Sequence, residues 1–214
     1  MDIGANVGVM SSLMAFRAGP RGKVVALEAH PLLFGELQEN IRAWSRSPQF
    51  ASFEPIEAAA TSEDGWMELK IPEGFATNRG TASVEASRSG AKAGGGIRIR
   101  AVRWDTIGAG RQVGVIKLDV EGHELSVLQG AENELGSGRI RDIFLECHPG
   151  SEPRVVEILE ATGYSVFRSV QRQSGPVLLA LDPPGENHRE LVATREPQRL
   201  LERFEQPGWG CLRP

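Results

Sequence analysis

The sequence contains little cysteine and no long apolar run. Its two cysteines, Cys147 and Cys211, are far apart and neither belongs to a CxxC motif, so they form no disulfide framework. We therefore expect reduced thiols and a cytoplasmic protein. No apolar segment approaches the ~20 residues that a membrane helix needs. Position 2 is acidic and no basic lead precedes it, so we expect neither a signal peptide nor a membrane segment.

Lysine and aromatic residues are also scarce. The basic residues are mainly arginine, with four lysines, and the net charge is −4, so no basic patch indicates a nucleic-acid partner. Aromatic residues make up 6% of the chain, and no aromatic cage for a cationic ligand stands out. The expected partner is a small molecule, and self-association into a homo-oligomer stays open.

Apolar strands alternate with helical patterns along a chain whose 214 residues, 40% of them hydrophobic, suffice for one domain with a core. Strands are expected at 23–28, 53–60, 113–120 and 142–147, with a hairpin at 164–170 and 177–181. Helical patterns lie at 9–16, 31–44, 125–135 and 152–162. This alternation predicts an α/β fold whose mostly parallel sheet is covered on both faces and ends in an antiparallel edge hairpin.

Two further regions complete the predicted organisation. Apolar and polar residues alternate at 66–71 and 97–104, which predicts two antiparallel strands. The Gly-, Ser- and Ala-rich segment between them, 77–96, is the best candidate for a mobile surface loop. We predict a domain over residues 1–182, followed at 183–214 by a polar, Pro-rich tail with one helix at 196–204.

Ligands of parallel sheets bind at the carboxyl ends of the strands, so these ends are the candidate site. The opening turn, DIGANVG at 2–8, has glycines where the backbone must turn sharply, and the helix after it favours an anionic ligand group. Its GxxxG spacing is not that of a dinucleotide fingerprint, and it has no Walker lysine. Glu28 ends the next strand, where an acid accepts hydrogen bonds from a ribose diol. Together these features predict a nucleoside that carries an amino-acid-like or phosphate group.

Four segments resemble the FkbM family of S-adenosylmethionine-dependent methyltransferases: DIGANVG at 2–8, LEAHPLLFGELQENI at 27–41, IKLDVEGHELSVLQGA at 116–131, and IFLECHP at 143–149. The resemblance implies a Rossmann-like methyltransferase sheet and S-adenosylmethionine as cofactor. It also implies that Asp2, Gly4, Asn6 and Gly8 surround the methionine part, that Glu28 holds the ribose, and that Ala29 and His30 line the adenine. Asp119 is then expected to face the sulfonium and the acceptor. Because known members mostly methylate hydroxyls, O-methylation of a sugar or similar small molecule is the default.

Methyl transfer to a hydroxyl needs correct positioning and a base that takes the proton. The candidate bases follow two strand ends: His148, Asp119, Glu121 and His123. We expect His148 as base, with Asp119 and Glu121 also in catalytic roles. Lys117 lies in a buried strand, so its ammonium needs a partner such as Asp119 or Glu146. Asp119, Glu146 and His148 are also ligand types that Mg²⁺ or Mn²⁺ accepts, but no tight spacing supports a metal, and none is predicted.

The chain departs from the family at its start. Relatives carry an apolar strand before DIGANVG, whereas here only Met1 precedes it, so the predicted sheet lacks most of its first strand. We expect that the chain is part of a longer one, although a partner chain filling the gap stays open. Two other functions remain: an NAD-dependent oxidoreductase on a similar sheet, and a truncated, non-catalytic nucleoside-binding module.

Overall fold

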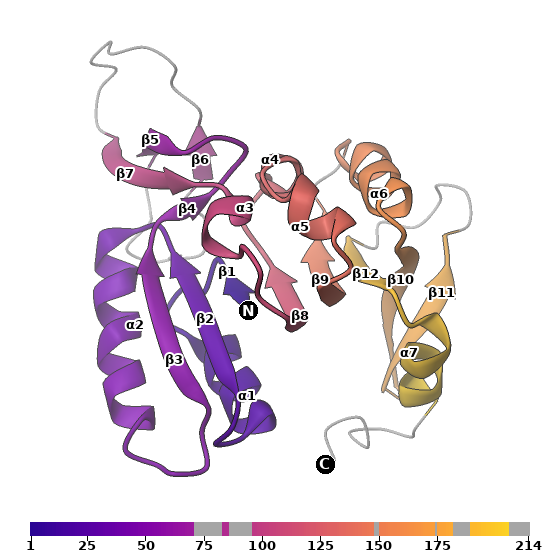
Figure 1. Ribbon diagram of the computed structural model, residues 1–214, viewed down its shortest axis with the longest axis horizontal. Coiled ribbons are helices and arrows are strands. Elements are labelled where there is room, and N and C mark those ends of the chain that lie inside the picture. The colour runs from indigo at the N-terminus through magenta and orange to yellow at the C-terminus, as the bar shows by residue number, and fades with distance from the viewer. Residues whose placement is uncertain (71–82, 86–95, 148–149, 174, 182–188, 206–214) are drawn as a thin grey trace.

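The computed structural model describes residues 1–70, 83–85, 96–147, 150–173, 175–181 and 189–205. Its main sheet has eight strands in the order β11-β10-β12-β9-β8-β1-β2-β3 (Figure 1). Their bounds are β1 Asp2–Ile3, β2 Lys23–Glu28, β3 Ser52–Glu57, β8 Val113–Leu118, β9 Ile140–Glu146, β10 Ser165–Arg172, β11 Gly175–Ala180 and β12 Glu190–Thr194. The five strands β9, β8, β1, β2 and β3 are parallel to their neighbours in this group. The pairs β9–β12, β12–β10 and β10–β11 are antiparallel. The predicted mostly parallel sheet with an antiparallel edge is therefore confirmed.

A second, four-stranded sheet has the order β4-β7-β5-β6, with β4 Ala59–Ala60, β5 Gly65–Lys70, β6 Ser83–Glu85 and β7 Ile97–Val102. Strands β5 and β7 are antiparallel, as their alternating sequence predicts. Their inward side chains form a small apolar cluster that contains Met67, Leu69 and Ile99. Most of the predicted surface loop at 77–96 lies outside the described residues.

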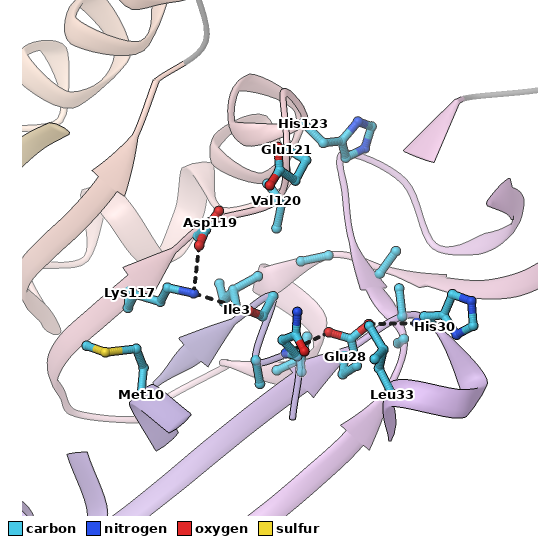
Figure 2. A pocket seen from close by; sticks show the side chains of 18 of the residues that line it. Ile3, Met10, Glu28, His30, Leu33, Lys117, Asp119, Val120, Glu121 and His123 are labelled. Atoms are coloured by element: carbon cyan, nitrogen blue, oxygen red, sulfur yellow. Dashed lines mark hydrogen bonds and ion pairs between the residues drawn. The ribbon is translucent and has the colours of Figure 1, made fainter. Parts of the chain in front are cut away.

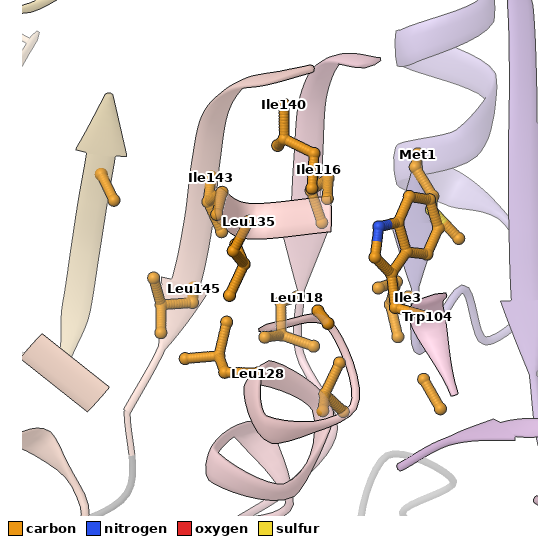
Figure 3. Packing of buried hydrophobic residues seen from close by; sticks show 14 of the residues in the cluster. Met1, Ile3, Trp104, Ile116, Leu118, Leu128, Leu135, Ile140, Ile143 and Leu145 are labelled. Carbon is orange, nitrogen blue, oxygen red and sulfur yellow. The ribbon is translucent and has the colours of Figure 1, made fainter. Parts of the chain in front are cut away.

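Helices cover both faces of the main sheet because successive residues of a strand point to opposite sides. In β2, Val25 and Leu27 belong to the large cluster formed with α4, α5 and α6, whereas Val24 and Ala26 pack toward α1 and α2. Figure 3 shows the large cluster, where leucines of α4 and α5 lie against β8 and β9. The helices are α1 Val9–Ala18, α2 Pro31–Trp44, α3 Trp104–Ile107, α4 Glu124–Gln129, α5 Glu132–Gly136, α6 Glu152–Ala161 and α7 Pro197–Phe204. No helix in the described ranges is both long and apolar enough to span a membrane.

The helix α1 is where its pattern predicts it, but the residues of that pattern face outward. Val9, Leu13 and Phe16 are 63%, 54% and 51% exposed. The buried face of α1 consists of the small residues Ser11 and Ala15. Ala15 packs on Val24 of β2, so this helix contacts the sheet through small side chains.

The helical pattern at 125–135 is divided into α4 and α5 at Gly130. A Cβ at Gly130 would lie 1.9 Å from the carbonyl oxygen of Thr61. The backbone of Gly130 therefore packs directly against the segment that follows β4. This tertiary contact, which periodicity does not encode, explains why one predicted helix becomes two.

The strand β12 extends the sheet beyond the predicted domain boundary at residue 182. Glu190–Thr194 pairs with β9 on one side and with β10 on the other, so residues 183–214 are not merely a tail. This strand was missed because its apolar residues are few and follow a polar, Pro-rich segment. The predicted helix after it is present as α7.

The first strand is short, as predicted, and is paired on both sides. Asp2 and Ile3 align with Ala26 and Leu27 of β2, and with Lys117 and Leu118 of β8. These pairings place the opening turn inside the sheet, between β8 and β2. They bring the carboxyl ends of β1, β2 and β8 to the same edge.

Candidate functional site

A cavity of about 400 Å³ lies at the carboxyl ends of β1, β2 and β8 (Figure 2). Its walls come from the opening turn, the ends of β2 and β8, the segment Ala58–Ala60, and Leu69 of the second sheet. Of the predicted site residues, the cavity brings together Gly4, Asn6, Glu28, Ala29, His30, Asp119 and Glu121. Asp2 and Gly8 are not on its wall, and His148 lies outside the described residues.

The opening turn needs both of its glycines. Gly4 has φ +78°, and a Cβ there would lie 1.8 Å from the carbonyl oxygen of Asp119. Gly8 has φ +91°, and its Cβ would lie 2.5 Å from Leu37 Cδ1. The amides of Gly4 and Ala5 donate to the carbonyl of Leu27 at 3.0 and 2.8 Å. The turn is thus held tightly between β2 and β8, with Gly4 on the cavity wall and Gly8 behind it.

Backbone strain is concentrated at the cavity. Among the described residues, Asn6 and Glu121 are the two non-glycine residues with positive φ, at 52° and 50°. Both line the cavity, one from the turn after β1 and the other from the turn after β8. Such conformations cost roughly 1 kcal/mol or more each and often occur at functional sites. The strain is therefore an independent indication that this cavity is the site.

Glu28 presents its carboxylate at the end of β2. Oε2 accepts from the Asn6 amide and Oε1 from the His30 amide, each at 2.8 Å (Figure 2). Burial raises the pKa of Glu28, while these backbone hydrogen bonds oppose the rise. None of the ion pairs among the described residues includes Glu28. Each oxygen retains a second lone pair, so the carboxylate can still accept hydrogen bonds from a ligand.

Asp2 lies beneath the turn and is wholly buried. Its Oδ2 accepts from Ser11 Oγ at 2.6 Å, and its Oδ1 is 3.6 Å from Lys117 Nζ. Burial raises the pKa of Asp2, and the Lys117 ammonium opposes that rise. The carboxylate holds the base of the turn and does not itself reach the cavity.

Asp119 follows β8 and is paired with Lys117 on the same strand. Asp119 Oδ2 lies 3.1 Å from Lys117 Nζ, which also donates to the Gly4 carbonyl at 3.2 Å. Asp119 is one of the two partners that the sequence predicts for Lys117. No role in the site was predicted for Lys117 itself, yet this side chain lines the cavity.

Two histidines line the cavity, and burial lowers the pKa of both. His30 is the N-cap of α2, where Nδ1 accepts from the Leu32 amide at 3.2 Å. Nε2 of His123 lies 3.1 Å from Thr61 Oγ1, which lies 3.0 Å from Ser126 Oγ. Sequence reasoning missed the contact with Thr61 because it joins two distant segments. Both rings favour the neutral form near pH 7.

Three acids and one lysine surround the cavity. Glu28, Asp119 and Glu121 contribute negative charge, and Lys117 contributes positive charge. Within the described part of the chain, no three His, Cys, Asp or Glu side chains come together as a metal ion would require. The acids therefore favour a ligand that carries positive charge.

The fold and the site define a class: a Rossmann-like α/β protein with its ligand cavity at the carboxyl ends of β1, β2 and β8. The model of the Methyltransferase FkbM domain matches residues 2–166, and the chain belongs to the FkbM methyltransferase family.

Known proteins similar to this chain include a curated methyltransferase and a solved methyltransferase structure. The hexuronic acid methyltransferase AglP of Haloferax volcanii is 30% identical over 158 residues, which cover 72% of this chain and 58% of that protein. A crystal structure of a methyltransferase FkbM from Methylobacillus flagellatus has a TM-score of 0.55 and 16% sequence identity. That match covers 90% of this chain and 42% of the other. The chain thus spans less than two thirds of the length of either protein.

Proposed function

We propose that this chain is an S-adenosylmethionine-dependent methyltransferase that acts on a hydroxyl of a sugar or similar small molecule. The observation that carries the proposal is the Glu28 carboxylate, which lines the cavity without an ion-pair partner among the described residues. It lies beside a strained glycine turn in a chain of the FkbM methyltransferase family. An acid in this position is suited to the ribose hydroxyls of a nucleoside.

The residues present fit this cofactor. Gly4 approaches Asp119 so closely that no side chain fits between them, which leaves backbone on the cavity wall. Ala29 and Ala58–Ala60 form a small-residue wall near Glu28 that suits a flat adenine ring. Asp119 and Glu121 supply negative charge that suits the positive sulfonium and α-ammonium. When bound, S-adenosylmethionine would supply an electrophilic methyl group.

The chain's own residues then have separate proposed roles. Glu28 binds the ribose, Ala29 and His30 line the adenine, and Gly4 and Asn6 contact the methionine part, with Asp2 and Gly8 supporting their turn. Asp119 and Glu121 orient the acceptor or take its proton, and His148 remains the proposed base from the sequence. Such positioning supplies much of the rate of an in-line displacement.

The acceptor class is supported by similarity. AglP is named as a hexuronic acid methyltransferase, and it shares 30% identity with this chain. We therefore propose a sugar acceptor and a hydroxyl as the methylated group. A hexuronic acid carries both hydroxyl and carboxyl groups, so product analysis must distinguish a methyl ether from a methyl ester.

The first experiment is calorimetric titration with S-adenosylhomocysteine and, separately, with NAD⁺. We expect micromolar binding of the first ligand alone, and a loss of at least tenfold in Glu28→Ala. Glu57→Ala is the matched control, because Glu57 aligns with Glu28 at the end of β3 but is exposed and outside the cavity. Binding of NAD⁺ instead, or no binding by a folded protein, would refute the proposed cofactor.

The second experiment measures transfer of a labelled methyl group to glucuronic acid and to neutral hexoses. A methyl ether on either sugar supports the proposal. A methyl ester would still show methyltransferase activity, but the methylated group would be the carboxylate and not a hydroxyl. Cofactor binding without transfer to any sugar in the panel would count against a sugar acceptor.

A further inference from the structure

We propose that Lys117 is a positioning residue. It holds the Asp119 carboxylate in one orientation over the cavity and connects it to the opening turn at residues 2–8. The catalytic consequence of this inference rests on the proposed function. Its geometric content concerns the protein alone and can be tested without a ligand.

The strand β8 places both side chains on the same side. Lys117 and Asp119 are two residues apart, whereas the intervening Leu118 and the preceding Ile116 are buried in the opposite, apolar cluster. Figure 2 shows the Lys117 ammonium between Asp119 and the turn after β1. The lysine therefore reaches the cavity edge although it belongs to a central strand.

Three oxygens surround the Lys117 ammonium, which has three N–H donors. Asp119 Oδ2 lies at 3.1 Å, the Gly4 carbonyl oxygen at 3.2 Å and Asp2 Oδ1 at 3.6 Å. These oxygens come from β8, from the glycine turn and from beneath that turn. One cation thus connects the opening turn with the end of β8 at the cavity wall.

This arrangement gives the two carboxylate oxygens of Asp119 different roles. Oδ2 is occupied by the ammonium, which leaves Oδ1 for a ligand. The Asp119 side chain is 42% exposed, and no hydrogen bond from another described side chain restrains it. Without Lys117 the carboxylate would be free to sample other rotamers, and an acid that must face a reacting centre would lose its pre-set orientation.

Lys117 also has a structural role, which the test must separate from its positioning of Asp119. Its ammonium is the side-chain cation next to Asp2, which is wholly buried. Removing Lys117 alone would take away the side-chain cation that faces this buried acid and would destabilise the fold. The test therefore uses Asp2→Asn as the background, because the amide needs no countercharge and can still accept from Ser11.

The ligand-free test measures the Hα–Hβ couplings of Asp119 by NMR in Asp2→Asn and in Asp2→Asn with Lys117→Met. We expect one rotamer in the first protein and averaged couplings in the second. Lys117→Arg, which keeps a cation, should retain most of the single rotamer. Unchanged couplings in the folded Lys117→Met protein would overturn the proposal, whatever the cofactor proves to be.

The functional test is a double-mutant cycle for Lys117→Met and Asp119→Asn in the same background, with S-adenosylhomocysteine as the probe. We expect each change to weaken binding by about tenfold and the combination to be no weaker than Asp119→Asn alone, because Lys117 acts through Asp119. Additive losses, or loss of melting temperature without loss of affinity, would assign Lys117 a structural role only. If the unmodified protein binds no S-adenosylhomocysteine, the proposed function fails, and the coupling measurement still decides the positioning role.

Discussion

Two groups of buried acids differ in how their charge is compensated. On the antiparallel side of the sheet, Asp142 is 2% exposed, accepts from Arg199 at 2.6 Å and from Arg141 at 3.0 Å, and also binds Thr194. Glu134 forms a two-point pair with Arg139, which lowers the pKa of Glu134. At the cavity, burial instead raises the pKa of Asp2 and Glu28.

The difference separates structural from functional charge. Arginine can pair with both carboxylate oxygens, which leaves little capacity for a ligand. Glu28 has only backbone amides, and Asp2 has a hydroxyl and a lysine at 3.6 Å. A protein rich in arginine keeps that residue away from the described wall of the cavity, whose cations are Lys117 and, when protonated, two histidines. Glu28, which lines the cavity and pairs with no arginine among the described residues, thus keeps acceptor capacity for a ligand.

Among changes at the cavity, one methyl group added at Gly4 should cause the largest loss of stability. Gly4→Ala would place Cβ 1.8 Å from the Asp119 carbonyl in a left-handed backbone, so we expect a loss of about 4 kcal/mol in unfolding free energy. Gly138→Ala is the matched control, because Gly138 has nearly the same φ as Gly4, +76°, but no atom lies within 4 Å of its Cβ. The control should lose only about 1 kcal/mol in denaturant titrations. Equal losses would show that the close approach to Asp119 is not important.

The structural side of the comparison predicts a different outcome for Asp142. Asp142→Asn removes the charge that two arginines share, and we expect a loss of about 2 kcal/mol in unfolding free energy. Affinity for S-adenosylhomocysteine should stay within twofold, since Asp142 is not on the cavity wall. Glu28→Ala should reverse this pattern, with at least tenfold weaker binding and a smaller loss of stability. The distinction fails if both variants lose affinity equally.

Relief of strain at Glu121 should sharpen the comparison by separating stability from function. Glu121→Gly removes the cost of φ 50°, offset by a more flexible unfolded chain, so we expect a net gain of about 0.5 kcal/mol. The same change removes a carboxylate from the cavity and should lower methyl transfer. Glu121→Gln keeps the strain and removes the charge, so it should lower transfer without a gain in melting temperature. A Glu121→Gly protein less stable than Glu121→Gln would refute the strain, because both variants lack the carboxylate and its contacts.

The smallest expected effect is the pH dependence at His30. Burial lowers the pKa of folded His30 below its ordinary 6.5, so its contribution to stability is present above that pH and lost as the pH falls. His30→Asn keeps an N-cap acceptor that does not titrate. Between pH 7 and 5, the unfolding free energy of the unmodified protein should fall relative to the variant by a few tenths of a kcal/mol. A difference that does not change with pH would show that His30 does not titrate on unfolding.

Local patterns predicted much of this fold, because its parallel strands are continuous apolar runs with turn residues after them. The strand Lys23–Glu28 and the helix that begins at Pro31 are present at their predicted positions. Where prediction failed, the cause was a distant contact. Gly130 divides a helix because Thr61 lies against it, and Glu190–Thr194 becomes a strand because β9 and β10 leave room for it.

The candidate site followed the same rule. The ends of β1, β2 and β8 could be predicted to converge, since parallel strands end at one edge of a sheet. The depth of each acid could not be predicted from sequence position. Asp2 and Glu28 both stand at strand ends, yet only Glu28 reaches the cavity.

The place of β12 has a consequence for synthesis. Its residues are made after those of every other strand in the described part of the chain, yet β12 lies in the sheet between β9 and β10. When the chain has emerged from the ribosome only as far as β11, one edge of β9 and one edge of β10 are therefore exposed. Both edges stay unpaired until residue 194 emerges. Exposed strand edges are the places where nascent chains join incorrectly. The interval between the emergence of β10 and that of β12 is thus a period in which β9 and β10 each have an exposed edge.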